Sequence, residues 1–90
     1  MYRVVFDSSV VKIIKKWEKS NPIFNKQLKK IIKELQVNPR TGLGHPEALK
    51  GGGDIIYSRH INKNNRIIYK IYDKEVLVFI FELEGHYDDK

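Results

Sequence analysis

The chain has 90 residues, and 17 lysine and arginine residues against 11 aspartate and glutamate residues give it a formal net charge of +6 at pH 7. A chain of this length can build one modest core, so we expect a single domain over residues 1–90. The absence of cysteine excludes disulfide bonds and thiolate metal ligands. No apolar run is long enough for a membrane span or a signal peptide, so we expect a cytoplasmic protein.

The positive charge predicts attraction to anionic partners. Nucleic acid, anionic lipid and an acidic protein are the classes that such a field attracts. Membrane binding is the weakest of the three, because so small a domain needs the apolar stripes of its helices for its own core. Nucleic acid and acidic proteins remain, and no membrane partner is expected.

The first half of the chain predicts one strand and an αα-hairpin. Tyr2–Phe6 is rich in aromatic and β-branched residues, which is typical of a strand, and the polar residues after it can cap a helix. Over Val10–Trp17, apolar side chains recur at helical spacing with lysines between them. Asn21 and Pro22 suit the N-cap and first position of a second helix, which ends before Pro39. Both helices are basic on their outer faces.

The second half predicts a long loop followed by three strands. Arg40–Asp54 holds five glycines, and a loop of this length in a small domain is more often functional than merely connective. Ile55–Ile61, Arg66–Tyr72 and Val76–Phe81 are strand-like and form an antiparallel meander. The last strand is apolar on both faces, so we place it centrally, with the helices covering one side of the sheet. The expected fold class is α+β, in the order β-α-α-β-β-β.

Residues suited to the cleavage of RNA gather in this second half. Without a metal, the reaction needs a base for the ribose 2′-hydroxyl, an acid for the departing 5′-oxygen and cations for the charged phosphate. The candidates are Glu47 as the base, His86 as the acid, and Arg59 and Arg66 as the cations, with Lys50 nearby.

Strand pairing can bring the two arginines together. A tight turn over residues 62–65 pairs Ile61 with Arg66, and by extension Arg59 with Ile68. In this register the arginines share one sheet face and can share one phosphate. A slip by one residue sends them to opposite faces, so the expectation depends on the register.

Each candidate also has a simpler interpretation. A lone Glu47 is more often a solvated loop carboxylate, basic residues on strands often serve to prevent aggregation, and a histidine near a chain end rarely marks a catalyst. Only the combination of these residues in one chain favours a catalytic site. Trp17 and Tyr57 fit core positions better than base stacking, whereas Tyr87 beside His86 can stack on an unpaired base.

Metal sites are not indicated by the sequence. The three histidines, His45, His60 and His86, lack a recognised ligand spacing, and no cysteine accompanies them. The glycine segments at 42–44 and 51–53 lack the lysine–serine signature of phosphate-binding loops. We therefore expect neither a metal nor another cofactor.

Four short motifs together resemble one family. They are Pro46–Lys50, Tyr57–Ile61, Asn65–Tyr69 and His86-Tyr87. As an ordered set that covers most of the chain, they resemble the YoeB/Txe toxins of the RelE/ParE superfamily. The resemblance implies the RelE/ParE-like fold, with the meander sheet packed on the αα-hairpin. It also implies a toxin of a type II toxin–antitoxin system, an endoribonuclease that cuts translated mRNA in the ribosomal A site with the 2′-hydroxyl as nucleophile and no metal.

The resemblance assigns catalytic roles to individual residues. Glu47 corresponds to the general base in the family's Pro-Glu-x-Leu-Lys motif. Arg66 corresponds to the arginine that stabilises the transition state, and His86 to the general acid. Tyr87 corresponds to the adjacent tyrosine, which orients the message or its base.

The resemblance also implies binding residues and partners. Lys50 and Arg59 correspond to basic positions that bind RNA. The implied partners are the ribosome with its mRNA, an acidic antitoxin of the YefM/Axe type and a second copy in a homodimer. Two alternatives stay open, namely a ParE-like protein that binds DNA gyrase and a non-catalytic RNA-binding module.

Three positions depart from the family pattern. Glu84 stands where a basic residue is common, and it brings a carboxylate close to His86. His60 replaces a second arginine, which weakens the local positive field. The segment 88–90 extends the chain beyond the tyrosine and adds negative charge. These departures bear on rate and RNA affinity more than on identity.

Overall fold

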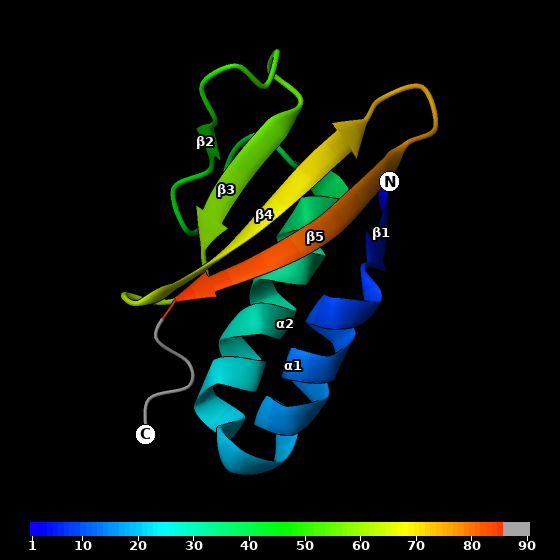
Figure 1. The fold of residues 1–90 in the computed structure, drawn as a ribbon. Coiled ribbons are helices and arrows are strands. Elements are labelled where there is room, and N and C mark those ends of the chain that lie inside the picture. The colour runs from blue at the N-terminus through cyan, green and yellow to red at the C-terminus, as the bar shows by residue number, and fades with distance from the viewer. Residues whose placement is uncertain (86–90) are drawn as a thin grey trace.

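Two helices pack against one face of a five-stranded sheet in the computed structural model, which describes residues 1–85 (Figure 1). His86 and Tyr87, the expected acid and its neighbour, lie outside the described residues. Within residues 1–85, neither helix combines the length and the apolar character needed to cross a membrane. In chain order the elements are β1 (Arg3–Phe6), α1 (Ser8–Ser20), α2 (Pro22–Val37), β2 (Glu47–Ala48), β3 (Ile56–His60), β4 (Asn65–Tyr72) and β5 (Leu77–Gly85).

The helix boundaries follow from capping side chains, as predicted. The Asp7 carboxylate accepts a hydrogen bond from the Ser9 amide at 3.0 Å and begins α1. Asn21 ends α1 and begins α2, since its amide donates to the last turn of α1 while its side-chain oxygen accepts from the Phe24 amide at 3.1 Å. Pro22 suits the first position of α2, where an amide proton would have no partner within the helix. A single residue therefore connects the two helices.

The sheet combines an antiparallel meander with a parallel N-terminal strand. Its order is β1-β5-β4-β3-β2. β3, β4 and β5 form the predicted meander, and β5 is internal, as expected for a strand that is apolar on both faces. It reaches Gly85, four residues beyond the predicted end at Phe81. β1 pairs with β5 in the parallel sense, which requires a crossover connection such as the two helices provide.

The loop Arg40–Asp54 contains a short strand that the sequence pattern does not reveal. β2 pairs antiparallel with β3, with Glu47 opposite Ser58 and Ala48 opposite Tyr57. Two residues are too few to show the alternation by which a strand is recognised. The middle of the expected loop is therefore the edge of the sheet.

The register of β3 and β4 differs by one residue from the expected one. His60, rather than Ile61, lies opposite Arg66, and Arg59 lies opposite Ile67. Residues that are direct partners share a sheet face, and adjacent residues of one strand point to opposite faces. The expectation that Arg59 and Arg66 share a face is therefore wrong.

The turn between β3 and β4 sets this register. The Ile61 amide donates to the Asn65 carbonyl at 2.9 Å, so Asn65 closes the turn one residue before the expected position. The side-chain oxygen of Asn62 accepts from the amides of Asn64 and Asn65 at 3.0 and 2.9 Å. The Asn62 side chain thus closes this turn in place of the expected tight turn. The resulting shift of the strand register by one residue moves every following side chain to the other face of the sheet.

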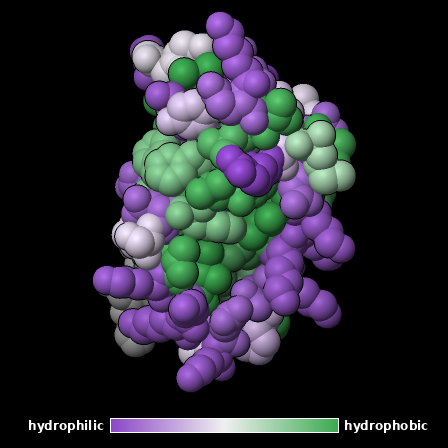
Figure 2. Space-filling view, turned by 90° about the vertical axis from the view of Figure 1, so that its right-hand side faces the viewer, coloured by the Kyte–Doolittle hydropathy of each residue, from purple (hydrophilic) through white to green (hydrophobic). Residues whose placement is uncertain are grey.

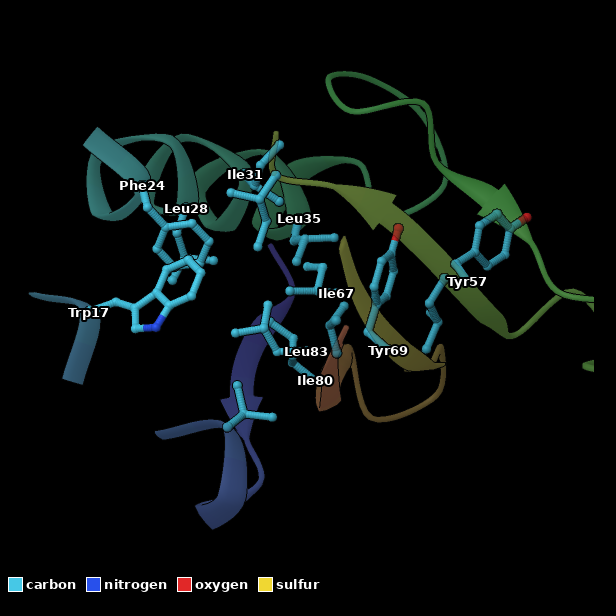
Figure 3. Close-up of a cluster of buried hydrophobic side chains, with 14 residues drawn as sticks. Trp17, Phe24, Leu28, Ile31, Leu35, Tyr57, Ile67, Tyr69, Ile80 and Leu83 are labelled. Atoms are coloured by element: carbon cyan, nitrogen blue, oxygen red, sulfur yellow. The ribbon is translucent and has the colours of Figure 1, made fainter. Parts of the chain in front are cut away.

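The core fills the space between the helices and the sheet (Figure 3). Trp17 of α1 and Phe24 of α2 meet edge to face, with ring centroids 4.0 Å apart. Tyr69 of β4 is completely buried, and its hydroxyl donates to the Pro39 carbonyl at 2.7 Å. Trp17 and Tyr57 are buried, as predicted. Within residues 1–85 the helices therefore cover one face of the sheet, and no helix covers the other, which we call the open face.

Candidate active site

Polar side chains form a row on the sheet face that the helices do not cover. Glu47 lies opposite Ser58. His60 lies opposite Arg66, which in turn lies opposite Glu84. Direct partners share a face, and so do alternate residues of one strand such as Ser58 and His60. Glu47, His60, Arg66 and Glu84 therefore share this face as one polar row, in which Glu47 is displaced by two residues along β3 from the other three. Figure 1 shows the four strands β2, β3, β4 and β5 that carry them.

A cavity of about 250 Å³ opens beside Arg66. His60 and Glu84 line it from the neighbouring strands, and Lys63 and Asn64 line it from the turn between β3 and β4. A lysine, an arginine, an imidazole and one carboxylate thus face the same small space, and the basic groups among them are suited to a phosphate. Among the residues that the structure describes, no group of three or more histidine, aspartate or glutamate side chains could hold a metal ion.

Arg66 and Glu84 form an ion pair at the wall of this cavity. The Arg66 Nε donates to Glu84 Oε1 at 2.9 Å, and the Nη2 lies 2.9 Å from the same oxygen. The side chains are 37% and 38% exposed, so solvent and ligands can reach both. The pair is therefore an exposed contact between neighbouring strands rather than part of the core.

Glu47 and Lys50 are exposed at the other end of the row, on β2 and just after it. The Leu49 amide donates to the Ile56 carbonyl at 2.9 Å and extends the pairing of β2 with β3. This hydrogen bond holds the segment between the two charged residues against the sheet. Glu47 therefore has a defined direction, although its position in the sequence suggests a free loop.

The ends of the loop that carries Glu47 are tied together. Arg40 donates from Nη2 to the Asp54 carbonyl at 2.9 Å and lies 3.0 Å from the Asp73 carboxylate in the turn between β4 and β5. The hydrogen bond with Asp73 raises the pKa of Arg40. The same bond, followed by that from the Tyr2 hydroxyl, holds the pKa of Asp73 below its usual range. Fixed ends restrict the positions that Glu47 can adopt.

Arg59 points to the helix face of β3 and has no exposed surface. Its guanidinium pairs with the Glu34 carboxylate at 3.1 Å and donates to the carbonyls of Asn38 and Thr41 at 2.8 and 3.0 Å. A buried charge requires such partners because its desolvation is costly. Its burial corrects the expectation that Arg59 binds RNA, since this side chain joins the end of α2 and the following loop to the sheet.

His60 belongs to the candidate site, although the sequence did not indicate it as a catalytic or binding residue. It is exposed, lies opposite Arg66 and lines the cavity. The signal that could have found it is the alternation along β3, in which Arg59 falls between the apolar residues Tyr57 and Ile61. That pattern places Arg59 with the core and His60 with the open face.

A second carboxylate lies near Arg66. Glu82 is opposite Ile68, on the same sheet face as Glu84. Desolvation by its surroundings, and then the neighbouring Glu84, raise the pKa of Glu82. The open face next to Arg66 is therefore more negative than the basic composition of the chain suggests.

A separate hollow of about 290 Å³ lies between α1, α2 and the end of β1. Figure 2 views the molecule from the side on which β1 and α1 lie, and it shows hydrophobic side chains bordered by hydrophilic ones. The hollow is lined mainly by apolar residues, together with charged ones that include Lys15 and Lys29. Its apolar lining consists of Phe6, Val11, Ile14, Leu28 and Ile32. This surface is suited to a partner that is itself partly apolar.

The arrangement of two helices on a five-stranded sheet matches that of known toxins. The YoeB/ParE toxin from Agrobacterium tumefaciens superposes with a TM-score of 0.82 at 24% sequence identity, over 97% of this chain and 100% of that chain. The YoeB–YefM complex from Staphylococcus aureus gives a TM-score of 0.79 at 26% identity, over 97% of this chain and 99% of that chain. The fold class is that of the YoeB and RelE toxins.

Sequence similarity narrows this class to one family. Residues 6–87 match the model of the YoeB-like toxin of bacterial type II toxin–antitoxin systems. Toxin YoeB from Streptomyces coelicolor is 29% identical over 76 residues, which cover 84% of this chain and 90% of that protein. The chain therefore belongs to the YoeB-like family of type II toxins, and the resemblance carried by the four motifs is confirmed.

Proposed function

We propose that this toxin inhibits translation by cutting mRNA in the ribosomal A site, through general acid–base chemistry that needs no metal. The observation that carries the proposal is the common sheet face of Glu47 and Arg66, which are far apart in the sequence. A carboxylate base and a phosphate-binding cation must face the same substrate, and their position on one face of the sheet supports such an arrangement. Membership of the YoeB-like family supports the same reaction.

Each proposed step follows from the chemistry of one side chain. Glu47 removes the proton from the ribose 2′-hydroxyl, and the oxygen attacks the adjacent phosphorus. Arg66 stabilises the negative charge that gathers on the phosphate oxygens. The bond from phosphorus to the 5′-oxygen breaks, and His86 protonates that oxygen. One RNA fragment then ends in a 2′,3′-cyclic phosphate, and the other begins with a 5′-hydroxyl.

Further side chains bind the message around the reacting phosphate. Lys50 and Lys63 are exposed cations near the two ends of the row and attract the RNA backbone. His60, opposite Arg66, can donate a hydrogen bond to a phosphate oxygen. Tyr87 stacks on an unpaired base. Arg59 has no part in this binding because it is buried.

The toxin is expected to be neutralised by an acidic antitoxin of the YefM type. In the similar Staphylococcus aureus structure, YoeB is in complex with YefM. The hollow between α1 and α2 offers an apolar floor with Lys15 and Lys29 in its lining. A segment that alternates apolar and acidic side chains can contact this apolar floor and pair with the two lysines, although Glu18 also lines the hollow. A homodimer, as in the Staphylococcus aureus YoeB dimer, is also expected and can be tested by light scattering.

In-vitro translation with the purified toxin tests the proposed reaction. Primer extension maps the ends of the message, and Glu47→Gln protein and ribosome-free RNA are the controls. We expect discrete cuts in the A site that require both ribosomes and Glu47. Intact message together with gyrase-dependent DNA breaks would favour a ParE-like action, and intact message alone would favour a binding module.

A further inference from the structure

Arg66 already holds a carboxylate in the free toxin. Glu84 occupies the guanidinium edge formed by Nε and Nη2. Its negative charge opposes the positive charge that the proposed reaction needs at Arg66. An RNA phosphate that binds Arg66 must either share the guanidinium with Glu84 or displace this carboxylate.

The backbone keeps Glu84 next to Arg66. The two residues are direct partners in the pairing of β4 with β5, and β5 has a neighbouring strand on each side. The carboxylate can therefore move away only by a change of its own side-chain conformation. Exposed ion pairs of this kind add little to folding stability, so the fold does not depend on the contact.

A second carboxylate near Arg66 adds to the negative charge of Glu84. Glu82 lies on the same face, and its pKa is raised by desolvation and by the neighbouring Glu84. His60 and Lys63 are the groups in the cavity that can balance this charge. An RNA phosphate would add a further negative charge to the same small space.

We infer that Glu84 attenuates this toxin by lowering the affinity of Arg66 for an RNA phosphate. The inference rests on the proposed function, in which Arg66 contacts the reacting phosphate. A phosphate in the cavity beside Arg66 lies against Glu84 as well, because both side chains line it. Two like charges about 6 Å apart weaken binding by about threefold at the dielectric constant of water and by about a hundredfold at the lower effective value near a protein surface, and for these half-exposed side chains we take an intermediate, about tenfold, effect.

The test compares two glutamate-to-glutamine variants of the full chain. Glu84→Gln removes the charge from the cavity and keeps the shape of the side chain. Glu75→Gln makes the same change of net charge in the exposed turn at the far end of β4 and β5. Fluorescence anisotropy with a short 2′-deoxy-substituted RNA, which cannot be cleaved, gives the dissociation constant at fixed ionic strength, and thermal unfolding checks the fold.

We expect Glu84→Gln to bind this RNA about tenfold more tightly, whereas Glu75→Gln changes the affinity less than about twofold. In an Arg66→Ala background the effect of Glu84→Gln should largely disappear, since the phosphate then loses the cation that holds it next to the carboxylate. Unchanged or weaker binding by a folded Glu84→Gln protein overturns the inference, and weaker binding indicates instead that Glu84 positions Arg66 for its ligand.

The binding test is separate from the test of the reaction. If the message is never cut but Glu84→Gln still tightens binding through Arg66, the attenuation stands and the proposed reaction fails. If the message is cut in the A site but Glu84→Gln binds RNA no better than the unaltered toxin, the reaction stands and the attenuation fails.

Discussion

Arg59 and Arg66 lie on neighbouring strands and each pairs with a glutamate, yet their surroundings are opposite. Arg59 has no exposed surface, whereas the Arg66 side chain is 37% exposed. Burial makes the pair with Glu34 part of the fold, because an unpaired buried charge is costly. Exposure allows Arg66 to exchange its partner, because a surface ion pair adds little to stability. The same residue type thus belongs to the fold on one face of the sheet and is accessible to a ligand on the other.

The two faces are also connected. Arg59 donates to the carbonyls of Asn38 and Thr41, at the beginning of the loop that leads to Glu47. Glu34, its ionic partner, also accepts from the Leu43 amide at 2.7 Å in that loop. The buried arginine therefore holds the backbone that presents the proposed base on the open face.

The largest expected effect is on stability and concerns the buried arginine. Arg59→Met should lower the free energy of unfolding by about 3 to 5 kcal/mol, because the Glu34 carboxylate and two backbone carbonyls lose their donor. Urea unfolding followed by circular dichroism measures this loss. Arg66→Met, the same chemical change on the open face, is the control and should cost about 1 kcal/mol or less. Equal losses of unfolding free energy in the two variants would contradict the conclusion that burial makes the Arg59 pair more important for stability than the Arg66 pair.

The next effect is on activity and concerns the exposed arginine. Arg66→Ala should slow cleavage of the message in the A site about a hundred- to a thousandfold, because the developing charge on the phosphate loses its stabilising cation. Single-turnover rates on programmed ribosomes measure the change, and urea unfolding should find the variant nearly as stable as the unaltered toxin. A loss of less than about tenfold would exclude Arg66 from the reaction.

The smallest effect concerns a third arginine pair, which is exposed like that of Arg66 and Glu84. The side chains of Arg40 and Asp73 are 30% and 50% exposed. The pKa of Asp73 is lower in the folded protein than in the unfolded chain. Its ionised carboxylate therefore stabilises the fold at a pH above the unfolded-state pKa, and this stabilisation is lost as the pH falls through the folded-state pKa. Asp73→Asn should therefore lower the Tm at pH 7, and its difference from the unaltered toxin should shrink below about pH 4.

Thermal unfolding across this pH range checks the Asp73 prediction. Glu75→Gln, an exposed position in the same turn, is the control for the change in net charge. A difference in Tm between Asp73→Asn and the unaltered toxin that stays constant from neutral to acid pH would show that the ionised carboxylate contributes nothing. If Asp73→Asn destabilised the protein at neutral pH as much as Arg59→Met does, the effect on stability would not follow the burial of the ion pair.

The candidate site was only partly predictable from the sequence. Glu47 and Arg66 were recognised by their motifs, and the structure brings them to one face. Arg59 was grouped with them because the turn at Asn62 was expected to be tight, whereas the Asn62 side chain closes it differently. Alternation along β3 places His60 on the open face, but its position opposite Arg66 depends on how that turn closes.

The sequence by itself determined the helices, the three long strands and the family. Capping residues such as Asp7 and Asn21 act within a few positions, and apolar spacing and short motifs are equally local. Only the tertiary structure decided the short strand at Glu47, the burial of Arg59 and the contact of Arg66 with Glu84. The physical reason is that strand register depends on how a turn closes and on which partner a strand meets, and a shift by one residue sends each side chain to the other face.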